Sequence, residues 1–102
     1  MHRASDEVEQ APWLEELDAA AEALDLDPET ASVAADLYLS AVPDTDRSKP
    51  AQVAASLYAA SLIVGEQRPQ TAVAEAVGVS RLVIQNRWKD VLRGAGFQPP
   101  GW

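Results

Sequence analysis

The chain has 102 residues and a formal net charge of −8, and 47% of its residues are hydrophobic, many of them alanine. This length suits one domain with one core, and the absence of cysteine excludes disulfides and thiolate zinc sites. No apolar run approaches the roughly 20 residues that cross a bilayer, and the acidic N-terminus lacks the apolar segment of a secretory signal, so we expect an intracellular protein with no membrane partner.

The charge is unevenly distributed along the chain. Residues 1–46 contain 13 of the 16 acidic residues and only Arg3 among the bases, a balance of −12. Residues 47–102 contain three acidic residues and seven bases, a balance of +4. An acidic total argues against nucleic-acid binding, but the field of a phosphate backbone is felt only over about 8–10 Å at ordinary salt. The second half is therefore the part of the chain suited to approach DNA.

The first predicted helix follows a polar segment. Residues 1–11 are expected to form a flexible acidic N-terminus, and Pro12 suits the first turn of a helix, where its missing N–H costs nothing. From Trp13 to Leu24 apolar residues recur at three- and four-residue intervals, the pattern of an amphipathic helix. We expect this helix to stop near Leu26, because an Asp-Pro pair follows and the residue before a proline disfavours helical angles.

A second helix is predicted to begin at Pro28. Asp27 is its expected N-cap, and Glu29 adds a negative charge to the first turn, where the helix dipole favours it. Pro43 ends the helix, and residues 43–50 have the composition of a loop. The residues of this helix expected to be buried are Val33, Ala34, Leu37, Tyr38 and Ala41.

A third helix is predicted from Ser48 or Pro50 to Ile63 or Val64. Apolar and small residues cover nearly its whole circumference, so we expect it to lie in the centre of the domain with the other helices around it. Gly65 is its expected stop, because glycine tolerates the left-handed backbone that commonly ends a helix.

Residues 70–93 predict a helix, a tight turn and a second helix, after a short turn at 66–69. Gly78 lies at the tight turn, and Ser80 is the expected N-cap of the last helix, its hydroxyl accepting from the first free amides. The residues expected to form a small core between the two helices are Val73, Ala74, Val77, Val79, Ile84 and Trp88. The side chains expected to point outward are Arg81, Leu82, Gln85, Asn86, Lys89 and Arg93. A polar, basic helix after a tight turn is the layout of a helix-turn-helix.

These elements predict an all-α fold. A five-helix domain is expected over residues 12–96, with the last two helices forming the helix-turn-helix. Residues 97–102 are expected to be an irregular tail, with Phe97 or Trp102 folding back onto the core.

The run from Ser48 to Val91 resembles a known family. Its third helix contains AASLYAAS, its fourth contains Gln70, Thr71 and VAEAVGVS, and its fifth contains IQNRWKDV. On these motifs the run resembles the second cyclin repeat of archaeal transcription factor B, the counterpart of eukaryotic initiation factor IIB. Five helices around an apolar third match the plan of the cyclin-like fold, although the first half of the chain matches only in helix count and spacing.

The resemblance implies a role and a set of residues. In that family the last two helices contact promoter DNA in the major groove beside the TATA box, together with the TATA-binding protein. By their place in the motif, the groove-facing residues are Ser80, Arg81, Gln85, Asn86 and Lys89. Arg87 also matches, but its helical position places it half toward the core.

Full-length members of that family also carry an N-terminal zinc ribbon, a polymerase-contacting linker and two cyclin repeats. This chain has no cysteine for a ribbon and room for one repeat, so loading of the polymerase is not expected of it alone. It is either an excised domain or a small stand-alone relative. Met1 and the acidic residues after it favour the stand-alone relative.

The chemistry of each outward side chain suggests its role. Arg81, Gln85 and Asn86 are expected to reach base edges, where Arg suits guanine and Asn or Gln suits adenine. Lys89 and Arg93 suit phosphates, which position a protein on DNA without specifying a sequence.

Other residues have more than one reading. Arg68 and Thr71, at the start of the fourth helix, are expected to add a phosphate contact at a helix N-terminus. Arg81 and Arg93 are equally compatible with solvated charges. Leu82 either touches a thymine methyl group or joins a protein interface.

The sequence carries no signature of catalysis. It contains no nucleophile elbow, phosphate loop or metal-ligand spacing, and His2 is the only histidine, so we expect neither an enzyme nor a metal or other cofactor. Two lysines among many acids and alanines resemble the composition of proteins from salt-loving archaea. An acidic mesophilic domain is the alternative reading of that composition.

Two functions from different classes remain open at this stage. The first is a DNA-binding transcription regulator in the cytoplasm, associated with the nucleoid, whose partners are double-stranded promoter DNA and a TATA-binding protein or another transcription component. The second is a cyclin-like protein-interaction module that binds a protein through the groove around its third helix. We expect a monomer, or a weak dimer formed through the apolar tail.

Overall fold

The structure is a computed structural model, and it describes residues 9–97. Within these residues it contains α-helices and one short 3-10 turn, and no strand: α2 (Ala11–Ala23), α3 (Pro28–Ser40), η1 (Asp46–Ser48), α4 (Lys49–Val64), α5 (Gln70–Val77) and α6 (Arg81–Gly94). The predicted all-α fold of five helices is confirmed. No helix of this part of the chain is long and apolar enough to cross a membrane. The expectations for Trp102 and for the first eight residues lie outside the described part.

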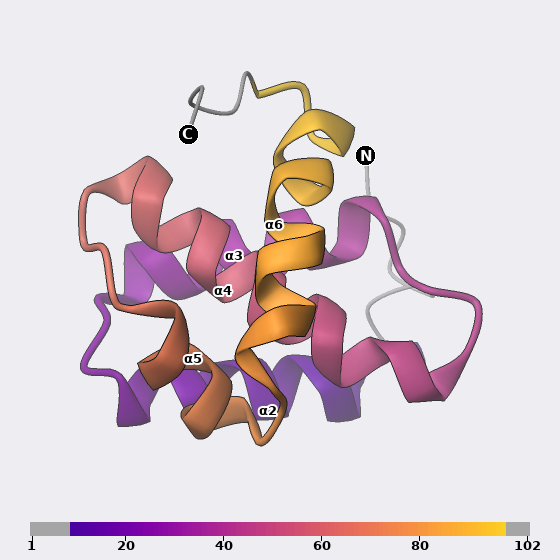
Figure 1. Ribbon diagram of the computed structural model, residues 1–102, viewed down its shortest axis with the longest axis horizontal. Helices are drawn as coiled ribbons and strands as arrows, with labels where there is room; N and C mark the ends of the chain where they lie inside the picture. Colours follow the sequence, from indigo (N-terminus) through magenta and orange to yellow (C-terminus); the bar gives the residue numbers. More distant parts are fainter. Residues whose placement is uncertain (1–8, 98–102) are drawn as a thin grey trace.

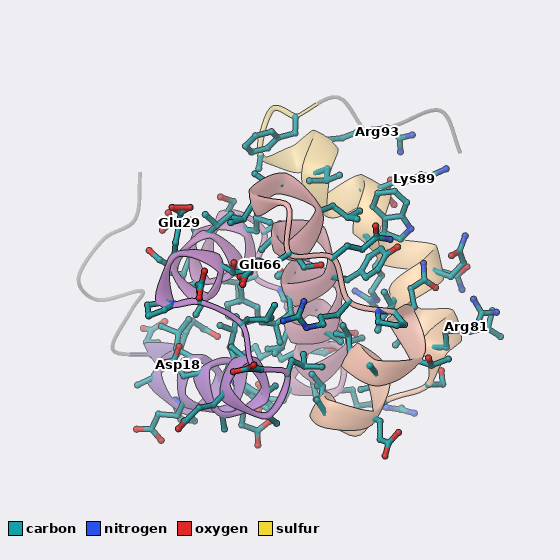
Figure 2. All side chains as sticks on the ribbon, turned by 90° about the vertical axis from the view of Figure 1, so that its left-hand side faces the viewer. Asp18, Glu29, Glu66, Arg81, Lys89 and Arg93 are labelled. Carbon is teal, nitrogen blue, oxygen red and sulfur yellow. The ribbon has the colours of Figure 1, made fainter. Side chains whose placement is uncertain are left out.

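Helix α4 lies in the middle of the domain, as its composition predicts. Every residue from 51 to 61 is buried. Helices α3 and α6 make the most extensive contacts with it, from opposite sides. Figure 1 shows α3 behind α4 and α6 crossing in front of it, and Figure 2 shows α2 and α3 on one side of α4 and α5 and α6 on the other. This arrangement is consistent with the cyclin-like plan.

The buried face of α3 differs slightly from the prediction. Its fully buried residues are Thr30, Ala34, Leu37 and Tyr38. Val33 is only half-buried, and Ala41 is exposed because the helix ends at Ser40 and Ala41 follows it with a non-helical backbone, φ −150° and ψ 60°. Ala41 instead accepts a hydrogen bond at its carbonyl from Nε2 of Gln52 in α4, at 3.0 Å.

The folded domain begins earlier than predicted. Gln10, which the sequence predicts to belong to the flexible N-terminus, is only 7% exposed. Its carbonyl accepts from the N–H groups of Trp13 and Leu14 at the start of α2, and its Oε1 accepts from the hydroxyl of Tyr38 at 2.9 Å. Burial, with a smaller contribution from the charge of Asp46, raises the pKa of Tyr38 to about 12.

Helix α2 ends at Ala23, three residues before the predicted stop. Asp25 adopts a left-handed backbone, φ +56°, and the N–H of Leu26 donates to the carbonyl of Ala21 at 2.9 Å. This is a Schellman motif, which satisfies carbonyls left free at the helix end. The prediction was wrong because it placed the stop at the Asp-Pro pair, whereas an aspartate accepts the left-handed conformation and ends the helix first.

Glu66, in the loop between α4 and α5, caps α3 from a distance. Its Oε1 accepts from the N–H of Asp27 at 3.0 Å and from the hydroxyl of Thr30. Asp27 occupies the predicted N-cap position with an extended backbone, φ −66° and ψ 154°, but its side chain makes no capping hydrogen bond. A carboxylate 39 residues away supplies the negative charge that the N-terminus of the helix favours.

Arg68 ties the same loop to the end of α2. Its Nε donates to the carbonyl of Leu24 at 2.9 Å, and its Nη2 donates to the carbonyl of Asp25 at 3.0 Å. Its Nη1 donates to the carbonyl of Glu66 at 3.0 Å. One arginine thus holds the left-handed turn after α2 against the residues that lead into α5.

Gly78 ends α5 with a left-handed backbone, φ +88°, and no atom lies within 4 Å of the position a Cβ would take. We expect Gly78→Ala to lower the free energy of unfolding by about 1 kcal/mol through backbone strain alone. Gly94, in the last turn of α6, also has open space around it but has no positive φ. Gly94→Ala should therefore raise the free energy of unfolding by about 0.5–1 kcal/mol. Urea unfolding measures the free energy of unfolding of both variants. A change of the same sign and size in the two variants would contradict the role of the left-handed backbone at Gly78.

The hydrogen bonds from Thr30 and from the N–H of Asp27, helped by the charge of Arg68, lower the pKa of Glu66 despite some desolvation. A carboxyl group whose pKa is lower in the folded state stabilises the fold above its ordinary pKa, and this stabilisation is lost as the pH falls. We expect Glu66→Gln to be less stable than the wild type at pH 7, and the difference to shrink as the pH is lowered below about 4. Thermal unfolding at several pH values measures this, with exposed Glu75→Gln as the control. A difference that does not depend on pH would refute the role of the charge.

Candidate nucleic-acid interface

The rotation of α6 about its own axis is set by its contact with α4. Trp88 is 1% exposed, and its ring meets the ring of Tyr58 edge to face, with centroids 5.5 Å apart and planes at 81°. The other buried residues of α6 are Ile84, Val91 and Leu92. Because these residues face α4 and the core, the opposite side of α6 must face outward.

The outward side of α6 carries a row of polar side chains spaced four residues apart, which we call the polar row: Arg81, Gln85, Lys89 and Arg93. Leu82, which is 59% exposed, and Asn86 lie beside this row. Lys89 is half-buried, and its ammonium group lies over the ring of Trp88, 5.5 Å from the centroid. The outward placement predicted for these side chains is observed, and Figure 2 shows Arg81, Lys89 and Arg93 projecting from the α6 side of the molecule.

Gln70, the first residue of α5, connects two members of the polar row. Its Nε2 donates to Oε1 of Gln85 at 2.8 Å, and its Oε1 accepts from Nη1 of Arg81 at 3.2 Å. We call this chain of three side chains the amide relay. The sequence motif includes Gln70, but the spacing between Gln70 and the residues of α6 does not indicate these contacts, because they depend on the angle between α5 and α6.

Two other arginines of α6 have partners of different kinds. Arg93 forms an ion pair with Asp90 one turn earlier on α6, 3.0 Å between Nη1 and Oδ1, and both side chains are exposed. An exposed pair of this kind is weak and screened by salt, so it leaves Arg93 available to a stronger anion. Arg87 donates from Nη1 to Oε1 of Gln52 in α4 at 3.3 Å, in agreement with its predicted position half toward the core.

The turn before α6 differs from the prediction in one respect. Ser80 occupies the N-cap position with an extended backbone, φ −81° and ψ 152°, but its hydroxyl makes no capping hydrogen bond. The N–H of Val83 bonds instead to the carbonyl of Ser80, at 3.3 Å. The predicted hydroxyl cap is therefore wrong, because the backbone carbonyl serves that amide. The side chain of Ser80 is exposed at the start of α6.

Arg68 does not join the polar row. Its guanidinium donates to carbonyls at the end of α2 and in its own loop, so most of its N–H groups serve the fold. Its predicted phosphate contact stays a prediction. Thr71 is exposed on the first turn of α5, close in sequence to the amide relay.

The charges of the described residues are separated in space as well as in sequence. Figure 2 shows Asp18 of α2 and Glu29 of α3 on the side of the molecule opposite Arg81, Lys89 and Arg93. An anionic duplex would be attracted by the α6 side and repelled by the α2 and α3 side. The negative total charge therefore does not prevent an approach through α6.

Two hollows on the surface are poor candidates for a binding site, because they contain few polar side chains. Two shallow hollows between α2 and α5 are lined mainly by alanine, with Glu16 and Glu75 as their charged residues. In the part of the chain that the structure describes, no group of three or more metal-ligating side chains comes together.

Comparison with known proteins gives partial matches. No protein-family model matches the chain. The chain is 41% identical over 54 residues to transcription initiation factor IIB of Pyrococcus horikoshii, covering 53% of this chain and 18% of the relative. It is 55% identical over 38 residues to transcription initiation factor IIB 1 of Thermoplasma volcanium, and the match covers 37% of this chain and 12% of that relative. It is 44% identical over 45 residues to transcription initiation factor IIB of Archaeoglobus fulgidus, and the match covers 44% of this chain and 14% of that relative.

The chain thus spans less than a fifth of the length of the curated relatives it matches. Within that limit the matches confirm the resemblance to archaeal transcription factor B.

The Trp88–Tyr58 contact should be measurable as stability. We expect Trp88→Leu to lower the free energy of unfolding by about 2–4 kcal/mol, because it leaves a cavity against α4 and removes the edge-to-face pair. Leu82→Ala, on the exposed side of the same helix, should change it by no more than about 0.5 kcal/mol. Denaturant unfolding monitored by circular dichroism compares the two. A small loss for Trp88→Leu would show that this contact does not fix α6.

Proposed function

We propose that this chain, which is similar to archaeal transcription initiation factor IIB over about half of its length, is a DNA-binding transcription factor or regulator. In this proposal the helix-turn-helix formed by α5 and α6 docks on duplex promoter DNA, with α6 in the major groove. The observation that carries the proposal is the polar row, which runs along the exposed side of a helix whose other side is locked to the core.

The geometry of α6 suits this role. A major groove about 12 Å wide admits one α-helix, and the N-terminal part of the second helix of a helix-turn-helix contacts base edges. Arg81 and Gln85 lie in the first turns of α6 with Leu82 and Asn86 beside them, so amide, guanidinium and apolar groups are offered together. Leu82 is suited to the methyl group of a thymine.

Phosphate contacts are assigned to the flanks of this surface. Lys89 and Arg93, farther along α6, bring two positive charges without a fixed base-pairing geometry. Ser80 and Thr71 are exposed at the starts of α6 and α5 and are assigned hydrogen bonds to the DNA backbone. These contacts would position α6, whereas the residues of its first turns would specify the sequence.

The names of the relatives point to transcription initiation, and the resemblance adds a TATA-binding protein as a second partner. We keep both as proposals for this chain, because it spans less than a fifth of each relative. The acidic side formed by α2 and α3 would repel DNA. It therefore supports only the orientation of the domain in which the α6 side approaches the duplex.

The alternative of a protein-interaction module is less well supported. It requires an open groove around α4, and every residue of α4 from 51 to 61 is buried by its neighbours. Phe97, which the sequence predicted to fold onto the core, is 45% exposed, but nothing in the described part of the chain indicates what would cover it.

The salt dependence of binding tests the proposal. The logarithm of the association constant for duplex DNA should fall linearly with the logarithm of salt concentration, and each lost phosphate contact should reduce the slope by about 1. We expect Lys89→Ala and Arg93→Ala each to weaken binding and reduce the slope. Fluorescence anisotropy with a labelled duplex measures both quantities.

Arg47→Ala is the matched control for Arg93→Ala. Each variant removes one exposed arginine and changes the net charge equally, but Arg47 lies in η1, which packs mainly on α4. Its slope should equal that of the wild type. Equal losses for Arg47→Ala and Arg93→Ala would mean that only net charge matters, and an absence of duplex binding at every salt concentration would refute the proposal.

A further inference from the structure

We infer that Gln70 determines sequence specificity without being on the recognition helix, by setting which end of the amide of Gln85 faces the bases. This inference rests on the proposed function and deepens it. It assigns Gln85 as a hydrogen-bond donor toward DNA, and therefore a preference for guanine at the base pair that Gln85 meets.

The amide relay joins the two helices in a fixed order. Arg81 and Gln85 are four residues apart on α6, so their side chains lie one above the other on the same side of the helix. Gln70, at the start of α5, inserts its amide group between them, 3.2 Å from Nη1 of Arg81 and 2.8 Å from Oε1 of Gln85. Both ends of one amide are thus used at the same time.

The guanidinium dictates the direction of the whole relay. An arginine only donates hydrogen bonds, so the end of the Gln70 amide that faces Arg81 must be its oxygen. The NH2 group of Gln70 then faces Gln85, which must answer with its own oxygen. The NH2 group of Gln85 is left as the end that is free to meet a ligand. The opposite assignment of either amide would bring two donors or two acceptors together.

Base edges in the major groove respond differently to such a donor. Guanine presents two neighbouring acceptors, N7 and O6, and thymine presents one, O4, whereas cytosine presents the N4 donor. Adenine would be matched by a glutamine that offers both its oxygen and its NH2 group, but here one of the two acceptor sites of that oxygen is already taken by Gln70, whereas the NH2 group keeps both of its N–H donors. A Gln85 held in this way favours guanine and rejects cytosine. This narrows the adenine preference that glutamine alone suggests.

Exclusion of water strengthens the effect in a complex. The hydrogen bonds of the relay are exposed in the free protein and compete there with water. When DNA covers α6, water leaves. A Gln85 amide turned with its oxygen outward would then lose its hydrogen bond to Gln70 on one side and to the guanine on the other. The relay would therefore act most strongly in the bound state.

The experiment selects binding sites for the full chain from a pool of double-stranded DNA with a randomised core, followed by sequencing. The wild type should enrich guanine at one position by about tenfold over cytosine. Gln70→Glu keeps an oxygen for Arg81 but has no N–H to give to Gln85, whose amide should turn and present its oxygen outward. At that one position the preference should change from guanine to cytosine or adenine, bases that offer a donor.

Further variants locate and control the effect. Gln85→Glu places an acceptor at the end of the relay, so it should enrich cytosine at the same position and so identify the base that Gln85 meets. Gln70→Ala should make that position nearly indifferent while other positions keep their preference. Gln67→Ala removes an exposed glutamine three residues before Gln70, outside the relay, and should leave the selected sequence unchanged. Gln70 is half-exposed, and thermal unfolding of each variant should match the wild type.

The outcomes distinguish DNA binding by α6 from the effect of Gln70 on sequence preference. A change confined to the Gln85 position in Gln70→Glu and Gln70→Ala supports the inference. If both variants select the wild-type sequence with undiminished preference, DNA binding stands and the relay has no part in specificity. A wild type that prefers cytosine at the position altered by Gln85→Glu also overturns the inference. If the wild type binds no duplex and enriches no sequence, the proposed function fails, and the inference fails with it.

Discussion

The edge-to-face contact between Trp88 of α6 and Tyr58 of α4 is the interaction on which the exposed surface depends. Helix α4 is buried throughout its middle and is packed on all sides. It therefore cannot shift to make room for the side chains of α6 if α6 rotates about its own axis. With Trp88 locked into this core, the polar row lies on the outward side of α6, next to Gln70 of α5. The ammonium group of Lys89 lies over the same ring system, 5.5 Å from the centroid, so one tryptophan links the core to the charged surface.

A second set of contacts fixes the helix that precedes α6. Glu66 and Arg68, in the loop before α5, bind the start of α3 and the end of α2 through hydrogen bonds of 2.9 to 3.0 Å. The point at which α5 begins is therefore tied to the first half of the chain. Gln70 follows two residues after Arg68, so the amide relay starts from an anchored backbone. The acidic half of the molecule thus contributes to the basic surface by holding its first helix in place.

The sequence allowed the main architecture to be predicted, because burial leaves a periodic trace. The apolar circumference of α4, the glycine after α5 and the outward polar side of α6 are all local patterns, and each is observed. The features that escaped prediction come from contacts between segments far apart in the chain. Neither the capping of α3 by Glu66 nor the relay through Gln70 leaves a spacing signal, since each depends on how whole helices are placed. The hydrogen bonds of Arg68 are of the same kind, because its charge is visible in the sequence and its carbonyl partners are not.

The proposed DNA-binding surface is the outward side of α6, and it is tested most directly by the map of backbone and side-chain amide chemical shifts during titration of the labelled chain with duplex DNA. The account predicts that the largest changes follow Arg81, Gln85 and Lys89 together with the side-chain amide of Gln70, while Asp18 and Glu29 on the opposite side stay unchanged. Changes centred on α2 and α3, or no change along α6 at saturating DNA, would contradict it.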